Sequence, residues 1–458
     1  MKMKSFEMDM TTGSLAKKMI SYALPFIATG ALQLLFNTAD VIVVGRFAGE
    51  TSLAAVGSTT SLIGLIVNMF MGLSVGVSVL VSQYYGSRHY EGVSQTVHTA
   101  FCVSLILGVL VGGFGFFFAK PMLMIMGSPH DVIDLATLYL KIYFCGTPAF
   151  LFYNFLAAAL RAVGDTRRPL IYLGSAGVLN IALNLIFVIV FHMGVAGVAL
   201  ATIVSQVLSA VLILRCMRKS HGSSYRIEYS QLKINWNKLF LMLKIGLPAG
   251  IQSSLFAISN VLIQSSINFW GSQVMAGNAA AQSLEGFTYT AMNSVSQTAL
   301  AFTGQNIGAG KLKNVTRVIY WSVLYVSAIG LIMGIVSYLF KAPLLGLFTT
   351  EDAVISHGSV RLLYVCFPYF LCGVMDVLVG VLRGIGYSLV PMLISVGGIC
   401  GFRILWIYTI YPIFHQLETI YISYPISWVI TGMIQAICLL FIIKKLQKHF
   451  DKRKGLTI

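Results

Sequence analysis

The 458-residue chain is 57% hydrophobic and only 10% charged, with a mean hydropathy of +0.83. Ordinary soluble domains contain about 25% charged residues, so this composition excludes a soluble globular or disordered protein and indicates an integral membrane protein. The formal net charge of +16 would also suit nucleic-acid binding, but basic loops next to membrane spans account for it better.

In chain order, twelve apolar stretches are each long enough to cross roughly 30 Å of hydrocarbon as a helix. The predicted spans are 20–47, 54–84, 95–119, 136–163, 169–191, 195–217, 239–269, 276–307, 315–340, 359–385, 389–411 and 421–443. The predicted fold class is therefore an all-α polytopic membrane protein with 12 transmembrane helices.

The distribution of Lys and Arg predicts the topology. The basic start before residue 20 resembles a signal-peptide n-region, but the apolar run behind it is too long and lacks an A-x-A exit, so we interpret it as the first span. An N-terminus on the cytoplasmic side places most basic residues in cytoplasmic segments, including the tail 444–454. We expect a multi-pass protein of the cell membrane with both termini cytoplasmic, and with no nucleic-acid partner.

The sequence offers little support for an enzyme. The seven cysteines form no C-x-x-C pair and the eight histidines form no H-x-x-H. No Walker loop and no G-x-S-x-G motif occurs. We expect no cofactor and no metal centre, with small molecules and the lipid bilayer as the partners of a monomer.

The chain repeats itself. GSRHYEGVSQTV after the second predicted span resembles GAGKLKNVTRVI after the eighth, and ALRAVGDTRRP resembles VLRGIGYSLVP, both at an offset of 222 positions. Six spans per repeat is an even number, so the halves run parallel in two pseudo-symmetric lobes around a central cavity, an arrangement typical of transporters. The predicted domains are an N-lobe at 1–217, a cytoplasmic linker at 218–237, and a C-lobe at 238–458 with a basic tail.

An ordered set of motifs resembles the multidrug and toxic compound extrusion (MATE) family over essentially the whole chain. The set comprises Pro25 and Asp40 in the first span, Q-x-x-G after the second, LRAVGDTRRP after the fourth and NIALN in the fifth. It is closest to the bacterial DinF-like branch, whose members use an acid of the N-lobe to couple drug export to a proton or sodium gradient. The wider superfamily also includes lipid-linked oligosaccharide flippases, which generally carry more spans.

Asp40 is the only acid in the predicted N-lobe spans and lies roughly 10 Å from the outer end of its helix. An ionised carboxylate at that depth costs several kcal/mol, so its charge state depends on whether water reaches it. We predict a proton carrier. The alternative is a neutral carboxyl held by hydrogen bonds to neighbouring helices.

Asn180 and Asn184 are one helical turn apart on the same face of the fifth span, and Thr202 follows in the sixth. With Asp40 they match the family's N-lobe cation site, except that Asn184 stands where related members have a second acid. One negative charge attracts Na⁺ less than two, so the resemblance favours coupling by protonation of Asp40. Asn37 and Asn154 are further candidates for the substrate cavity, or for hydrogen bonds between helices.

Pro25 removes a backbone hydrogen bond near the cytoplasmic end of the first span and predicts a point where that helix bends. The resemblance implies that this bend accompanies protonation; a static kink is the alternative.

The second half contains three charged candidates within its spans, Glu285, Asp376 and Arg403. We predict a C-lobe charge site in which Arg403 balances one of the two acids, and in which the other acid acts in transport.

Together these features predict a secondary active exporter of amphipathic, cationic compounds, working by alternating access in exchange for H⁺ or Na⁺. A lipid or glycolipid flippase is the alternative, and an interaction scaffold or receptor is a more distant one.

Overall fold

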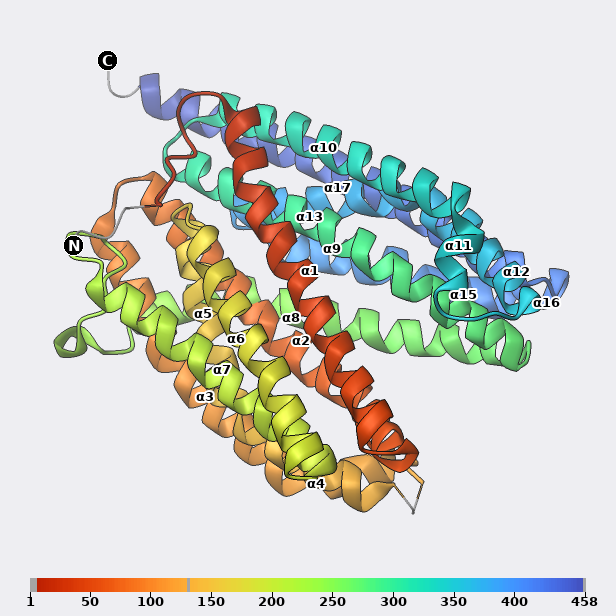
Figure 1. Cartoon of the computed structure of the whole chain (residues 1–458). Helices are drawn as coiled ribbons and strands as arrows, with labels where there is room; N and C mark the ends of the chain where they lie inside the picture. Colours follow the sequence, from red (N-terminus) through yellow and green to blue (C-terminus); the bar gives the residue numbers. More distant parts are fainter. Residues whose placement is uncertain (1–5, 130–131, 456–458) are drawn as a thin grey trace. The chain divides into compact units, whose positions relative to one another are not determined.

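The structure is a computed structural model that describes residues 6–129 and 132–455. Those residues form helices joined by short turns, with no strand among them. The chain divides into two compact units (Figure 1). Unit 1 contains the N-terminal segment up to Asp9 and residues Leu24–Gly250, and unit 2 contains Met10–Ala23 and the chain from Ile251 onward.

The helices of unit 1 follow the predicted first six spans. They are most of α1 (Leu15–Phe47), α2 (Glu50–Gly86), α3 (Tyr90–Ile125), α4 (Ile133–Cys145), α5 (Thr147–Ala162), α6 (Arg167–Leu185) with the π-helical turn η1 (Ile186–Val190), α7 (Gly194–Lys219), the short 3₁₀ turn η2 (Tyr229–Gln231) and the start of α8 (Trp236–Asn268).

Unit 2 repeats this order with more interruptions. Its elements are the rest of α8, α9 (Ser272–Gly308), α10 (Leu312–Leu339), α11 (Lys341–Gly346), α12 (Asp352–Arg361), η3 (Leu362–Cys366), η4 (Phe367–Tyr369), α13 (Phe370–Ile385), α14 (Leu389–Ser395), η5 (Val396–Gly401), α15 (Phe402–Thr409), α16 (Tyr411–Phe414) and α17 (Leu417–Gly455).

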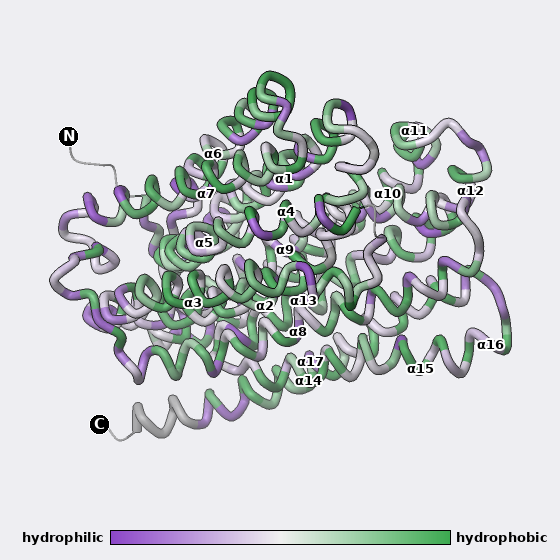
Figure 2. Tube along the Cα trace, turned by 90° about the horizontal axis from the view of Figure 1, so that it is seen from below, coloured by the Kyte–Doolittle hydropathy of each residue, from purple (hydrophilic) through white to green (hydrophobic). Residues whose placement is uncertain are grey.

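The helices have the length and composition of membrane spans. In the described part of the chain, ten helical stretches are long and apolar enough to cross a bilayer, and the bent pair α4–α5 makes an eleventh. The remaining predicted span, the eighth, is α9, a 37-residue helix whose polar residues keep its hydropathy low. Figure 2 shows hydrophobic residues along the spans and hydrophilic residues gathered in many of the connecting loops. The protein is thus an all-helical, multi-pass membrane protein.

The fourth span of each repeat is interrupted, which the sequence did not lead us to expect. In unit 1, α4 and α5 meet at Gly146 with a bend of 46°. In unit 2, the corresponding span is interrupted by η3 and η4. Pro368, in η4, lies 222 positions after Gly146. A Cβ on Gly146 would lie 2.9 Å from the Gln206 side chain of α7, and Pro368 has no backbone N–H to donate. Each break is therefore followed or occupied by a proline, Pro148 at the start of α5 and Pro368 in η4.

The boundary between the units runs through α8, and glycines explain why its beginning belongs to unit 1. Gly72 and Gly76 of α2 are spaced four residues apart, as are Gly246 and Gly250 of α8. A Cβ on Gly72 would lie 2.1 Å from the Gly250 backbone nitrogen, so the two backbones touch. This is the close approach that small residues at four-residue spacing permit between membrane helices.

The beginning of α1 and the residues just before it, Met10–Ala23, belong to unit 2, although the rest of α1 belongs to unit 1. The Gln305 side chain of α9 accepts a hydrogen bond from the Met10 backbone at 3.1 Å. Tyr22 meets Phe302 edge-on, with ring centroids 5.7 Å apart. The units of the structure therefore differ from the predicted domains at two places, since residues 10–23 join unit 2 and residues 218–250 join unit 1. Pro25 and Pro248 each lie within two residues of a crossover.

Candidate functional site

The structure brings together the four residues of the predicted N-lobe cation site. Asp40 comes from α1, Asn180 and Asn184 from α6, and Thr202 from α7. The Asn184 side-chain amide donates a hydrogen bond to the Asp40 carboxylate and another, at 3.2 Å, to Asn180 Oδ1. Asn180 Nδ2 lies 3.5 Å from Thr202 Oγ1, which itself donates to the Val198 carbonyl. The result is a continuous polar row across three helices.

A glycine positions α1 against α6 at this row. Gly177 lies one turn before Asn180, and Phe36 lies one turn before Asp40. A Cβ on Gly177 would lie 1.8 Å from the Phe36 ring, so a larger residue there would push the helices apart. Next to this contact, Val43, Val44, Val198 and other buried residues form a hydrophobic cluster of unit 1. The polar row thus lies in an apolar, closely packed environment.

The row has the chemistry of a proton or cation site. Asp40 is half-buried, and it has no ion-pair partner in the described part of the chain. Asn184 is 0% exposed, and its Oδ1 is buried without a hydrogen-bond partner among the described residues. One negative charge with carboxylate, amide and hydroxyl oxygens around it can be neutralised by a proton or by a hard cation such as Na⁺.

In the described part of the chain, the two cavity candidates are not joined to this row by hydrogen bonds, although Asn37 lies one turn before Asp40 on α1. Asn154 is buried, and its amide donates to the Phe150 carbonyl of its own helix at 2.8 Å. Asn37 is exposed on α1. Within residues 6–129 and 132–455, neither forms a hydrogen bond with Asp40, Asn180 or Asn184. Their role in a substrate cavity stays a prediction.

The predicted pairing of Arg403 with an acid is wrong. Glu285 instead pairs with Arg361, whose Nε and Nη2 lie 2.6 and 2.8 Å from the two carboxylate oxygens. Arg361 is 2% exposed, and its Nη1 donates to Asn278 Oδ1 at 2.8 Å. Bidentate geometry and further hydrogen bonds are what a buried ion pair requires, so this pair is a structural element of unit 2.

Arg403 is stabilised by aromatic rings instead of a carboxylate. Its guanidinium lies 4.0 Å from the centroid of Tyr424 and 5.6 Å from that of Trp428. Its Nε donates to Ser427 Oγ at 2.9 Å. Cation–π contacts of this kind hold a buried guanidinium without neutralising it. Arg403 therefore keeps its positive charge beside α17.

Asp376 is the remaining C-lobe acid. Its backbone carbonyl accepts a hydrogen bond from Ser296 at 2.7 Å, while its half-buried carboxylate has no ion-pair partner among the described residues. Arg383 lies two turns further along α13 and donates to Gln252 at 2.8 Å. Of the two acids, Asp376 is thus the one without an ion-pair partner among the described residues.

Sequence reasoning missed Arg361 and Asn278 as partners of Glu285. Arg361 lies at the start of the predicted span 359–385, where a basic residue is ordinarily solvated. The interrupted helix explains the error, because α12 begins at Asp352 and carries Arg361 into the packed interior. A usable signal was the length of the chain between Phe340 and the predicted span start at 359, which is long enough for another helical segment.

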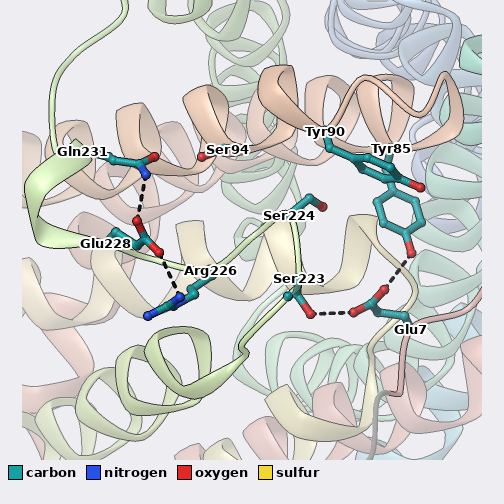
Figure 3. Close-up of a pocket in the computed structure, with 10 residues that line it drawn as sticks. Glu7, Tyr85, Tyr90, Ser94, Ser223, Ser224, Arg226, Glu228 and Gln231 are labelled. Carbon is teal, nitrogen blue, oxygen red and sulfur yellow. Dashed lines mark hydrogen bonds and ion pairs between the residues drawn. The ribbon is translucent and has the colours of Figure 1, made fainter.

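A separate polar region lies at the end of unit 1 where α2, α3 and the segment after α7 meet. Glu7 accepts hydrogen bonds from Tyr85 at 2.8 Å and Ser223 at 2.9 Å, beside a cavity of about 560 Å³ (Figure 3). Nearby, Asp165 accepts from the Arg168 backbone N–H at 3.0 Å, and burial raises the pKa of Asp165. The hydrogen bonds of Glu7 hold the N-terminal segment against the rest of unit 1.

Comparison with known proteins gives a consistent picture. The MatE family model matches residues 25–186 and 248–409, one segment in each repeat and well over half of the chain. The chain is 29% identical over 394 residues to the probable multidrug resistance protein YpnP of Bacillus subtilis, covering 84% of this chain and 86% of that protein. It is 23% identical over 385 residues to the probable multidrug resistance protein NorM of Thermotoga maritima, covering 83% and 82%.

The fold is also that of a solved transporter. The structure matches the outward-facing conformation of a multidrug resistance MATE family transporter of the MOP superfamily with a TM-score of 0.88. The match covers 96% of this chain and 98% of that chain at 22% sequence identity. At this identity the likeness shows the shared fold.

Proposed function

The chain belongs to the MATE family of multidrug efflux transporters, and from this premise we propose that it is an antiporter that exports amphipathic, cationic organic compounds in exchange for H⁺. A transporter family and a multi-pass helical fold give it a membrane location. The basic loops and tail support a cell-membrane protein with both termini in the cytoplasm.

The observation that carries the proposal is the polar row Asp40–Asn184–Asn180–Thr202 in an apolar environment. Asp40 is its only acid and has no basic partner within ion-pair distance in the described residues. Such a carboxylate is costly when ionised and dry, and far less costly when protonated. Its protonation therefore depends on which side of the membrane water reaches it.

The composition of the row favours H⁺ over Na⁺ as the coupling ion. Asn184 supplies an amide whose nitrogen donates to Asp40, which leaves one formal charge in the row. Na⁺ binding draws on the summed charge of its oxygen ligands, and a single carboxylate provides half the attraction of two. A proton needs only the one carboxylate.

The charge of the proposed substrate is inferred from the acids that lack a basic partner. The carboxylates of Asp40 and Asp376, which form no direct ion pair among the described residues, favour cationic substrates, and apolar side chains nearby favour amphipathic ones. Pro25 and Pro248, next to the points where α1 and α8 pass from one unit to the other, are positions where these helices can bend during alternating access.

The proposal is tested in liposomes that contain the purified protein. A fluorescent organic cation is followed under a pH gradient alone and then under a Na⁺ gradient alone. We expect transport driven by the pH gradient, and no transport in liposomes without protein. Transport with Na⁺ alone would overturn the assignment of the coupling ion. Movement of labelled phospholipid without movement of the cation would indicate a flippase.

A further inference from the structure

Beside the cavity of Figure 3, unit 1 has a second and larger cavity of about 810 Å³ at the end of α7. It is lined by basic residues of the last turn of α7, by Arg226 and Glu228 of the following segment, and by the apolar Val211 and Leu214. Glu228 forms an ion pair with Arg226 at 2.9 Å, which neutralises both. The positive charge of Arg215, Arg218 and Lys219 remains.

These three cations are available to an anionic ligand. All three are exposed, and none of their side chains forms an ion pair or hydrogen bond with another described residue. Arg218 is nevertheless held in place, because its guanidinium lies 4.3 Å from the centroid of the Tyr229 ring. Stacking uses the face of the guanidinium and leaves its in-plane N–H groups free to bind oxygens of a phosphate.

The cavity continues an exposed apolar stripe of α7. Val204, Val207, Val211, Arg215 and Arg218 follow one another at intervals of three or four residues, so they share one face of the helix. The three valines are exposed on the apolar span, at 43%, 44% and 53%. The 26 residues of α7 rise about 39 Å, more than the roughly 30 Å of hydrocarbon, so its last turn reaches the level of the lipid headgroups.

In the second repeat, the helix that corresponds to α7 is α17, and it has no basic residues at the three equivalent positions. The positions 222 residues after Arg215, Arg218 and Lys219 are Ile437, Leu440 and Phe441 of α17. Those side chains are 55%, 60% and 70% exposed. Where unit 2 exposes apolar side chains, unit 1 exposes three cations beside a cavity.

We propose that the cavity formed by Arg215, Arg218 and Lys219 at the end of α7 binds the phosphate headgroup of an anionic phospholipid, with the acyl chains lying along Val204, Val207 and Val211. The combination of an apolar stripe and a basic cavity on one helix face distinguishes a lipid from a soluble anion. The inference concerns lipid binding and is independent of the direction or coupling of transport.

Lipid binding is measured directly, by native mass spectrometry of the full chain released from detergent with added phosphatidylglycerol or phosphatidylcholine. The test variant is Arg215→Gln/Arg218→Gln/Lys219→Gln. The matched control is Lys444→Gln/Lys445→Gln/Lys448→Gln, which removes three exposed charges from the tail helix α17. If the triple variant is not monodisperse, Arg215→Gln and Arg218→Gln are measured singly.

We expect the wild type to retain phosphatidylglycerol in preference to phosphatidylcholine. Each cation near a lipid headgroup contributes about a fivefold factor in affinity, so the triple variant should lose at least about tenfold. The control should stay within about twofold of wild type. Equal loss in the control, or no preference in the wild type, would overturn the proposal. Displacement of the lipid by excess glycerol 3-phosphate would do so too, because it would show a site for soluble phosphate.

Discussion

Asn184 of α6 donates its side-chain amide to the carboxylate of Asp40 on α1, joining two spans that are 144 positions apart in sequence. The hydrogen bond fixes which amide atom faces the acid, and it leaves Asn184 Oδ1 buried without a partner. The pair therefore combines the charge of Asp40, the N–H donor of Asn184 and the acceptor Oδ1 of Asn184 in an apolar environment.

Asp40→Asn should abolish pH-driven export while the protein remains folded. The amide has nearly the shape of the carboxyl group and can still contact Asn184, but it cannot carry a proton between the two sides of the membrane. Export of the fluorescent cation in liposomes should fall to the level of protein-free liposomes. Thermal stability in detergent serves as the control for folding, and pH-driven export at the wild-type rate would contradict the coupling role.

Asn184→Asp should introduce sodium dependence. A second carboxylate adds Coulomb attraction in a site of low dielectric, so the Na⁺ concentration for half-maximal transport should fall by about tenfold or more. The charge-matched control is the double variant Asp40→Asn/Asn184→Asp, which has one carboxylate, as the wild type does. A single variant with the same ion dependence as the wild type would show that Na⁺ does not bind between these two residues.

Glu285→Ala should destabilise the protein by about 3–5 kcal/mol, because it leaves the buried guanidinium of Arg361 without its bidentate partner. Replacing both partners, as Glu285→Gln/Arg361→Met, should recover most of that loss. Thermal unfolding in detergent measures both variants. Asp376→Asn is the comparison: it should fold normally and change export. Wild-type stability of Glu285→Ala would mean that the pair is not needed to hold α9 and α12 together.

Gly72→Ala should destabilise the protein by about 1–3 kcal/mol, because its Cβ would lie 2.1 Å from the backbone of Gly250. The matched control is Gly64→Ala on the same helix, where nothing lies within 4 Å of the added Cβ. That change should be neutral or slightly stabilising, since alanine favours helix. Equal effects of the two substitutions would show that α2 and α8 do not touch at Gly72.

Sequence reasoning succeeded where a local pattern determines the structure. Long apolar runs predicted the spans, and the four-residue spacing of Asn180 and Asn184 predicted a shared helix face. The structure places Thr202 and Asp40 at that face as the family resemblance implied. The functions of these residues stay predictions.

The failures involve packing between segments far apart in sequence. Nothing near Glu285 in the chain identifies Arg361, 76 positions away, as its partner instead of Arg403. Gly72 and Gly76 signal a close helix crossing, but the motif does not name the helix that approaches. The close packing at Gly146 depends likewise on α7, whose Gln206 and Ile203 occupy the space that a side chain would fill.

The first parts of α1 and α8 belong to different units from the remainder of the same helices. Each repeat supplies its opening segment, Met10–Ala23 or Trp236–Gly250, to the unit formed mainly by the other repeat. A chain cut in the connection after α7 would yield two fragments, neither of which contains a complete unit. In this respect the arrangement is analogous to domain swapping, in which two similar units exchange an equivalent element.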